Sequence, residues 1–165
     1  MLFRSLRPFF IIGPGKTGDV TSDFARGIVK IERGLENSLK VGSLEPIRDF
    51  LPIKDALVAF DLVAERGVAG EVYNICSGRG YEIGQILQLL KAQAKTWIEI
   101  QQDQALFRLL DERVKIGDNN KIRGLGWMQA QTVEEALGEV LNYWRNHEGL
   151  SSTLVEAGRC VRSRL

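Results

Sequence analysis

The chain has 165 residues and a mass of 18.5 kDa, with 44% hydrophobic and 26% charged residues, which is typical of a globular protein with one core. Its 22 Lys and Arg residues against 21 Asp and Glu leave a net charge of +1, which disfavours nucleic acid as a partner. No apolar run reaches the roughly 18 residues that a membrane span requires, so no membrane partner is expected.

The two cysteines, Cys76 and Cys160, match no metal-binding or redox spacing. We therefore expect no metal site, and a reducing, cytoplasmic location. The arginine-bearing start was weighed as a targeting peptide, but Arg7 and Pro8 interrupt its apolar run and no small-residue cleavage site follows. A strand is the preferred interpretation of this start.

Strand-like and helix-like patterns alternate along the chain. A buried strand is predicted over residues 3–12, and Ser22 is the expected N-cap of a helix that Gly34 ends. The remaining predicted elements are strands at 39–42 and 47–52, a helix at 53–67, a strand at 70–76, a helix at 81–93, a strand at 96–100 and a short helix within 118–127.

The last helix is predicted to open with a capping box, Thr132-x-x-Glu135, and to run through Trp144. The alternation of strands and helices predicts an α/β fold. We expect residues 1–148 to form a single α/β domain and residues 149–165 to form a weakly structured tail. The three tryptophans are expected in the core.

Two glycine-rich segments suggest nucleotide binding. In "IIGPGKTG" (11–18), the Gly-Lys-Thr end of a P-loop is present, but Phe10 stands where the first glycine belongs and Pro14 removes an amide donor. A P-loop is therefore rejected. In "VYNICSGRGYEIG" (72–84), glycines lie between a strand and a helix, as in a dinucleotide-binding turn.

That second segment leaves two interpretations open. Gly78 and Gly80, with Glu99 lying 21 residues after Gly78, resemble an NAD-binding fingerprint. Against this, Glu82 would place a negative charge in the first turn of the helix, where it would compete with a pyrophosphate. The alternative is an ordinary strand-to-helix turn.

Several segments, taken in order, resemble one family. They are "RPFFIIGPGK", "TSDFARGIVKIERG", "LKVGSLEPIRDFLPIKDALVAF", "GEVYNICSGRGYEIGQIL", "FRLLDERVKIGDNNKIRGLGW" and "TVEEALGEVLNYWR". Together they cover about residues 3–146 and resemble the extended short-chain dehydrogenases/reductases that act on GDP-sugars, in particular GDP-mannose 4,6-dehydratase and GDP-4-keto-6-deoxy-mannose reductase. The resemblance implies the C-terminal part of a Rossmann-like fold with a small mixed α/β lobe that binds the nucleotide sugar.

The chain departs from that family in what it lacks. In the family, the dinucleotide loop and the Tyr-x-x-x-Lys pair precede the Arg-Pro-Phe segment, and no Tyr-x-x-x-Lys occurs in this sequence. A hydride-transfer enzyme of this type needs a tyrosinate whose pKa is lowered by a nearby lysine. We therefore expect no catalysis by this chain alone, no bound NAD(P), and a requirement for an N-terminal half on another chain or for self-association.

The resemblance also assigns site residues. Arg48 and Arg108 match arginines that bind the nucleotide-sugar ligand, and arginine suits a diphosphate because its planar fork donates two hydrogen bonds. Asp111 matches an acid that accepts hydrogen bonds from ribose hydroxyls. Pro8 and Phe9 match backbone that passes the nicotinamide, so they are candidate cofactor contacts.

Three functions are carried forward. The first is the GDP-sugar-binding portion of an NAD(P)-dependent dehydratase or reductase. The second is a small NAD-binding Rossmann-like domain that uses Gly78, Gly80 and Glu99. The third is a non-catalytic interaction module, suggested because Phe10 and Ile11 replace the polar residues that the family has there.

Overall fold

The computed structural model describes residues 3–107 and 112–147. Its helices are α1 (Val20–Glu32), α2 (Ile53–Arg66), α3 (Ile83–Ala92), α4 (Asn120–Arg123) and α5 (Val133–His147), with one 3-10 turn, η1 (Gln104–Leu106). Its strands are β1 (Ser5–Pro8), β2 (Phe10–Ile12), β3 (Ser38–Val41), β4 (Ile47–Pro52), β5 (Val72–Ile75), β6 (Gly80–Glu82), β7 (Glu99–Gln102) and β8 (Val114–Lys115). The predicted mixed α/β class is confirmed. Within these ranges, no helix has the length and apolarity needed to cross a membrane.

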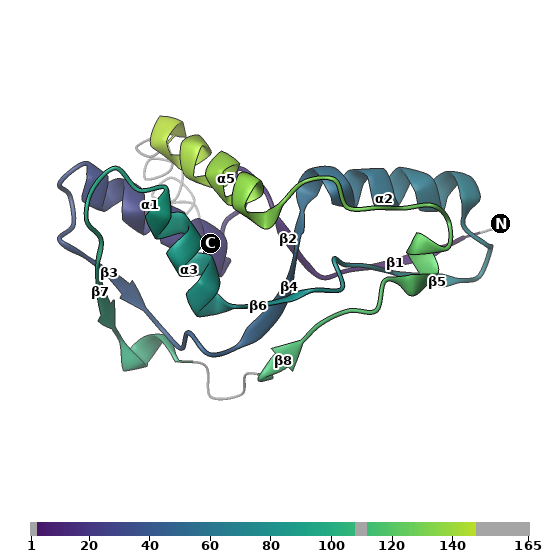
Figure 1. The fold of residues 1–165 in the computed structure, drawn as a ribbon, viewed down its shortest axis with the longest axis horizontal. Coiled ribbons are helices and arrows are strands. Elements are labelled where there is room, and N and C mark those ends of the chain that lie inside the picture. Colours follow the sequence, from purple (N-terminus) through teal and green to yellow (C-terminus); the bar gives the residue numbers. More distant parts are fainter. Residues whose placement is uncertain (1–2, 108–111, 148–165) are drawn as a thin grey trace, which may run out of the picture.

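The strands form three short sheets. β1 pairs with β5 and β3 pairs with β7, both in parallel. The third sheet has the order β2-β4-β6, with β8 also paired to β4; β6 is the antiparallel member. In Figure 1, α2, β1 and β5 form one end of an elongated molecule, α1, α3, α5, β3 and β7 form the other, and β2 and β4 lie between them.

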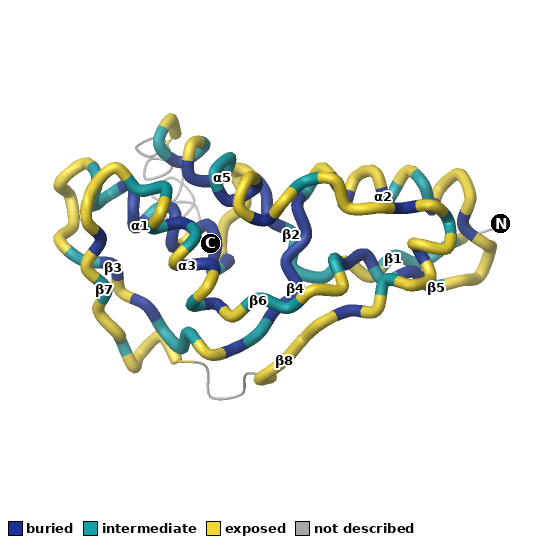
Figure 2. Tube along the Cα trace, in the orientation of Figure 1, coloured by how far each residue is buried: buried dark blue, intermediate teal, exposed yellow. Residues whose placement is uncertain are grey.

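Two hydrophobic cores lie on the two sides of β4. Successive strand residues point to opposite faces, and accordingly Phe50 joins one core while Leu51 joins the other. The first core contains buried side chains of α1, α3 and α5, such as Ile28, Leu87 and Leu141. The second core contains those of α2, β5 and the loop after α4, among them Val63, Tyr73, Ile75 and Trp127. Figure 2 shows buried backbone concentrated where these helices face the strands.

The single strand predicted over residues 3–12 is wrong, because the chain passes from one sheet to another at Phe9. β1 pairs with β5, whereas β2 pairs with β4. The Phe9 N–H donates to the Ile75 carbonyl (3.0 Å), and the next residue, Phe10, already pairs with Phe50. β1 is partly polar and β2 is apolar, but no glycine or turn segment separates them, so the sequence pattern does not mark the change of sheet.

The first helix begins earlier than predicted. Asp19, rather than Ser22, is the N-cap of α1: its carboxylate accepts from the amides of Thr21 (2.9 Å) and Ser22 (3.2 Å). Aspartate and serine are comparably good caps, so propensity did not separate the two positions. The consequence is that a carboxylate already occupies the positive end of this helix.

The last helix confirms its predicted start. The Glu135 amide donates to Thr132 Oγ1 (3.2 Å), and the Thr132 amide donates to the Glu135 carboxylate (2.9 Å), which is the reciprocal pattern of a capping box. Trp127 and Trp144 are buried as expected. Trp97 is the exception, since it is 81% exposed and lies under the ammonium group of Lys91, 5.2 Å from the ring centre.

Asp49 links three segments that are far apart in the sequence. Its side chain is fully buried and accepts from the Ser77 amide (2.7 Å), the Ser77 hydroxyl (2.6 Å), the Gly78 amide (2.9 Å) and the Gly117 amide (3.1 Å). β4 is thereby tied to the turn between β5 and β6 and to the loop before α4. Asp49 therefore has a structural role.

Asp55, at the start of α2, makes a second connection of this kind. Its carboxylate accepts from the amides of Ala130 (2.9 Å) and Gln131 (3.1 Å), and its carbonyl accepts from the Trp127 indole (3.1 Å). These bonds fix the segment that leads into α5. Asp55 is therefore also structural.

We expect Asp49→Ala to destabilise the fold by about 3–5 kcal/mol, because it leaves several buried donors unpaired. Asp49→Asn should cost a similar amount, since its amide group would face the backbone donors. Urea denaturation followed by circular dichroism measures the loss. The matched control, Asp61→Asn on the exposed side of α2, should change the free energy of unfolding by no more than about 0.5 kcal/mol. Equal effects of the two Asn variants would contradict the role given to Asp49.

A nearly buried ion pair joins α1 to α5. The Arg145 guanidinium donates to both oxygens of Glu32, at 2.9 and 2.6 Å, and also to the Gln93 carbonyl (2.8 Å) at the end of α3. These hydrogen bonds lower the pKa of Glu32 from its ordinary value of 4.5. Because the folded pKa is depressed, the pair stabilises the fold above pH 4.5, and this stabilisation is lost as the pH falls through the folded pKa.

Glu32→Gln should therefore lower the free energy of unfolding by about 1–2 kcal/mol at pH 7, a value reduced for partial solvent screening. The difference from the parent chain should shrink steadily as the pH is lowered below 4.5. Urea denaturation of both proteins at several pH values measures it. A difference that stays constant over this range would show that Glu32 acts through packing rather than charge.

Candidate functional site

A cleft of about 670 Å³ lies between the start of α1, the end of β3, the start of β4 and η1. The residues that line it come from six separate segments: Phe10, Lys16, Gly18–Val20, Asp23, Phe24, Lys40–Ser43, Pro46, Arg48, Ile83 and Ala105–Phe107. This volume lies in the range of small-molecule sites. The cleft is the candidate functional site.

Arg48 is the most enclosed cation of the cleft. It lies on β4, is only 5% exposed, and donates from Nη1 to the Ile47 carbonyl (2.8 Å). Its strand neighbour Asp49 is held by the hydrogen bonds described above, so the backbone that carries Arg48 is fixed. A guanidinium positioned in this way suits a phosphate or carboxylate ligand.

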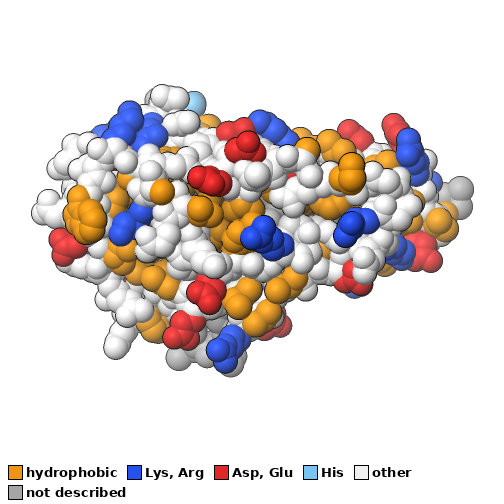
Figure 3. Space-filling model, in the orientation of Figure 1, with side chains coloured by type: hydrophobic (Ala, Val, Ile, Leu, Met, Phe, Trp, Pro, Cys, Tyr) orange, Lys and Arg blue, Asp and Glu red, His pale blue; other side chains and the backbone are white. Residues whose placement is uncertain are grey.

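Two exposed lysines add positive charge. Lys16, in the loop before α1, donates to the Ile11 carbonyl (3.0 Å) and lies 3.5 Å from an Asp19 carboxylate oxygen. Lys40, on β3, lines the opposite wall. Acidic and basic side chains are interspersed over the face of the molecule seen in Figure 3.

Two carboxylates stand at the start of α1. Asp19 is engaged as the helix cap, whereas Asp23, one turn further on, is exposed at the cleft. The pKa of Asp23 is raised because neighbouring protein excludes water on one side and because the Asp19 charge lies nearby, with Arg26 opposing the shift. Negative charge thus gathers at one part of a cleft whose other part holds Arg48.

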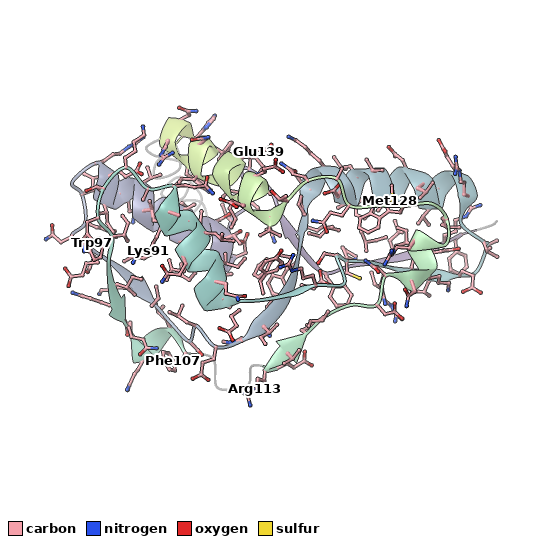
Figure 4. The ribbon with its side chains drawn as sticks, in the orientation of Figure 1. Lys91, Trp97, Phe107, Arg113, Met128 and Glu139 are labelled. Atoms are coloured by element: carbon pink, nitrogen blue, oxygen red, sulfur yellow. The ribbon has the colours of Figure 1, made fainter. Side chains whose placement is uncertain are left out.

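The rest of the cleft is apolar. Phe24, Val41 and Ile83 are buried in its floor, while Leu106 and Phe107 are 52% and 41% exposed at its edge. Figure 4 labels Phe107 beside η1, at the margin of the molecule. A flat apolar side chain at an open edge offers a surface on which a nucleobase can stack.

Gly42 lets the two sides of this edge come together. A Cβ atom at position 42 would lie 2.7 Å from the Leu106 carbonyl oxygen, so no larger residue fits there without a shift of the backbone. The loop after β3 and the turn η1 are consequently held in contact.

The predicted ligand-binding residues divide into two groups. Arg48 lines the cleft, as the pattern required. Arg108 and Asp111 lie outside the described residues, although Phe107, which immediately precedes Arg108, lines the cleft. The two predicted cofactor contacts do not line it: Pro8 is exposed at the end of β1, and Phe9 is half-buried between β1 and β2.

The glycine turn at 77–80 has a structural use. Gly78 adopts a positive φ of 76°, and the amides of Ser77 and Gly78 donate to Asp49. A pyrophosphate bound at this turn would need the same two amide donors. Because they already donate to the Asp49 carboxylate, the turn has no free donors for it. Glu99 lies on β7, which pairs with β3 in a different sheet. The geometry thus disfavours the small NAD-binding interpretation.

The rejected P-loop segment packs against the last helix. A Cβ atom at Gly15 would lie 3.2 Å from the Tyr143 hydroxyl oxygen. The Lys16 ammonium donates to the Ile11 carbonyl of the same loop. Because the P-loop was rejected, the sequence analysis did not name Lys16 as a candidate site residue, although Lys16 lines the cleft. Lys40 and Asp23 were also missed, because single charged residues on a strand and a helix give no sequence signal.

Two other reactive side chains of the described residues, Cys76 and His147, lie outside the cleft. Cys76 is buried, and burial together with the Asp49 charge raises the pKa of its thiol to about 12. The ring of His147 stacks on Tyr143 at 4.2 Å. Among the described residues, no three His, Cys, Asp or Glu side chains gather in a way that would hold a metal ion.

The sequence is similar to a known protein family and to characterised relatives. The family model described as GDP-mannose 4,6 dehydratase matches residues 2–140. A GDP-6-deoxy-D-mannose reductase from Pseudomonas aeruginosa is 36% identical over 143 residues, which cover 85% of this chain and 47% of that protein. A GDP-6-deoxy-D-talose 4-dehydrogenase from Aggregatibacter actinomycetemcomitans is 30% identical over 118 residues, covering 71% of this chain and 39% of the relative.

Solved structures agree. The structure of RMD from Pseudomonas aeruginosa complexed with NADPH is similar with a TM-score of 0.81 and 34% identity, over 87% of this chain and 48% of that one. A UDP-glucose 4-epimerase from Thermotoga maritima, solved with UDP-glucose, has a TM-score of 0.72 and 27% identity, over 88% and 47%. The chain spans about half the length of these relatives. It has the Rossmann-like architecture of the NAD-dependent epimerase/dehydratase superfamily, and it belongs to the GDP-mannose 4,6 dehydratase family.

Proposed function

We propose that this chain supplies the nucleotide-sugar-binding part of an NAD(P)-dependent GDP-sugar dehydratase or reductase. The observation that carries the proposal is the placement of Arg48, a nearly buried guanidinium in the wall of a 670 Å³ cleft with apolar surfaces beside it. The family match and the GDP-sugar relatives favour a GDP-hexose as the ligand.

The chemistry of the cleft suits each part of such a ligand. A diphosphate carries negative charge that Arg48 would bind through two parallel hydrogen bonds, with Lys16 adding longer-range attraction. The exposed ring of Phe107 offers a stacking surface for the base. Arg108 and Asp111 remain proposed ligand contacts on the strength of the family pattern.

The residues present do not fit an NAD(P) site by themselves. Among the described residues, the strand-to-helix turn that most resembles a pyrophosphate cradle directs its amides at Asp49. The sequence also holds no Tyr-x-x-x-Lys. We therefore assign no hydride-transfer step to this chain, and Pro8 and Phe9 stand only as proposed contacts to a cofactor carried by a complementary half.

A complementary half has a place to attach. Ser5 and Phe9 donate their amides toward β5, so the alternate residues Leu6 and Pro8 present their backbone to the other edge of β1. Within the described part of the chain, no strand pairs with that edge. An unpaired edge is a template for another strand, and we propose that an N-terminal half or a second copy of this chain supplies it.

The first test is ligand-dependent stability. GDP and GDP-mannose should raise the melting temperature of the purified chain, whereas NAD alone should not, because a ligand stabilises a protein only if it binds the folded state. Arg48→Met should weaken GDP binding about 10–100-fold, as expected from the loss of charge-assisted hydrogen bonds worth about 1.5–3 kcal/mol. Isothermal titration calorimetry measures the affinity.

A second cleft variant and one control variant separate binding from folding. Lys16→Ala removes an exposed charge of the cleft and should weaken GDP binding severalfold with no loss of stability. Arg123→Ala removes an equal charge from exposed α4 at the other end of the molecule and should leave affinity unchanged. Equal affinity of all three variants and the parent would remove the assignment of the cleft. Stabilisation by NAD alone would instead support a dinucleotide site.

A further inference from the structure

The outward side of α2 carries apolar residues where a surface helix normally carries polar ones. The helix buries Ala56, Ala59 and Val63 in the second core. On the opposite side, the neighbouring residues Leu57 and Val58 are 52% and 57% exposed. Adjacent exposed apolar side chains on an otherwise amphipathic helix mark a candidate contact surface.

Two opposite charges flank this apolar pair at equal distances along the helix. Lys54 lies three residues before Leu57, Asp61 lies three residues after Val58, and both are exposed. Positions i, i+3, i+4 and i+7 share one side of a helix, so these four residues form a single stripe, which we call the α2 stripe. Figure 3 shows hydrophobic side chains at the surface, with basic and acidic neighbours, over the part of the molecule where Figure 1 places α2.

The α2 stripe is complementary to itself. If two copies of α2 run antiparallel about a two-fold axis between residues 57 and 58, Leu57 lies opposite the partner's Val58, and Lys54 lies opposite the partner's Asp61. Each contact then occurs twice, as in any interface formed by the same surface of two identical subunits. A parallel arrangement would instead bring each charge to its own copy, lysine to lysine and aspartate to aspartate.

Two further acidic residues lie near the α2 stripe. Glu139 on α5 accepts a hydrogen bond from Lys54 (2.5 Å), but the ammonium group has three donors and the Lys54 side chain is 63% exposed. Glu65, one turn beyond Asp61, adds negative charge at the end that the partner's Lys54 would approach. The net charge of the chain is only +1, so two copies repel each other little as a whole.

The size of the surface sets the strength of the contact. The α2 stripe extends over about two turns, which is small beside the roughly 1,200–2,000 Å² that stable interfaces bury. Met128, which is 79% exposed, adds apolar surface: Figure 4 labels it beside α2, in the segment whose residues Trp127 and Ala130 donate to Asp55. We therefore expect a weak contact, with a Kd on the order of 10–100 µM.

We propose that the outward side of α2 joins two copies of this chain, with their α2 helices antiparallel about a two-fold axis. The occupant is a second copy because the α2 stripe matches itself in both charge and apolar character. This surface is separate from the cleft, and it faces away from β1 and β5 (Figure 1). The inference thus goes beyond the proposed function, and the dimer leaves both the ligand site and the open edge of β1 accessible.

Sedimentation velocity on the full chain over a range of concentrations measures the association. The parent should pass from monomer to dimer near the expected Kd at low ionic strength, and high salt should weaken the dimer severalfold because exposed ion pairs are screened. Lys54→Glu and Asp61→Lys, each alone, place like charges opposite each other and should raise the Kd about 10-fold or more. The double variant Lys54→Glu/Asp61→Lys restores opposite charges and should bring the Kd back to within about threefold of the parent.

The design separates association from folding. Lys54→Glu loses the hydrogen bond to Glu139 both alone and in the double variant, so recovery in the double variant reports contact between copies. The control Lys115→Glu reverses an exposed charge on β8 and should dimerise like the parent. Circular dichroism confirms that each variant is folded.

Three results would overturn the inference: a parent chain that stays monomeric well above the expected Kd, a dimer that none of the α2 variants weakens, or a double variant no tighter than the single ones. GDP affinity should be the same in all these variants, because the α2 stripe lies outside the cleft. Absence of GDP binding would therefore remove the proposed function and leave this inference standing.

Discussion

The fold and its candidate site depend on one buried carboxylate. Asp49 accepts hydrogen bonds from the β5–β6 turn and from the loop before α4, so it joins three segments that span residues 49 to 117. It is adjacent in sequence to Arg48, whose side chain points the other way from β4 into the cleft. The bonds that occupy the glycine turn therefore also fix the strand that carries Arg48, the proposed ligand-binding cation. One interaction accounts both for the absence of a dinucleotide cradle at that turn and for the rigidity of the cleft wall.

The cleft itself follows from the way the two cores share β4. α1, α3 and α5 pack as one unit held by Glu32 and Arg145, and β3 with β7 lies beside them. The loop after β3 approaches η1 closely because residue 42 is a glycine. Charged and apolar groups from elements distant in sequence thus converge on one hollow. The open edge of β1 lies at the other end of the molecule, so the surface proposed for a complementary half does not compete with the ligand (Figure 1).

Much of the fold could be predicted from the sequence, and the reasons are local. Capping boxes, glycine stops and apolar periodicity located the long helices, and Thr132 with Glu135 fixed the start of α5. The short strands β6 and β8 were not predicted, since two or three residues carry no periodicity. The passage of the chain from one sheet to another at Phe9 and the exposure of Trp97 depend on tertiary packing. Of the candidate site, Arg48 was predicted through the family resemblance, whereas Asp23 and Lys40 give no sequence signal and come together only when α1 packs beside β3.

The chain belongs to the GDP-mannose 4,6 dehydratase family and spans about half the length of the relatives it matches, and the cleft beside Arg48 is its candidate ligand site. The central proposal is that the Arg48 guanidinium binds the diphosphate of a GDP-sugar in the cleft between β4 and α1. The most direct measurement is a crystal structure of the chain with GDP bound. The account predicts electron density for the diphosphate beside Arg48. Density for GDP on the 77–80 turn, or in the cleft with its phosphates at the α1–β3 end, would contradict it.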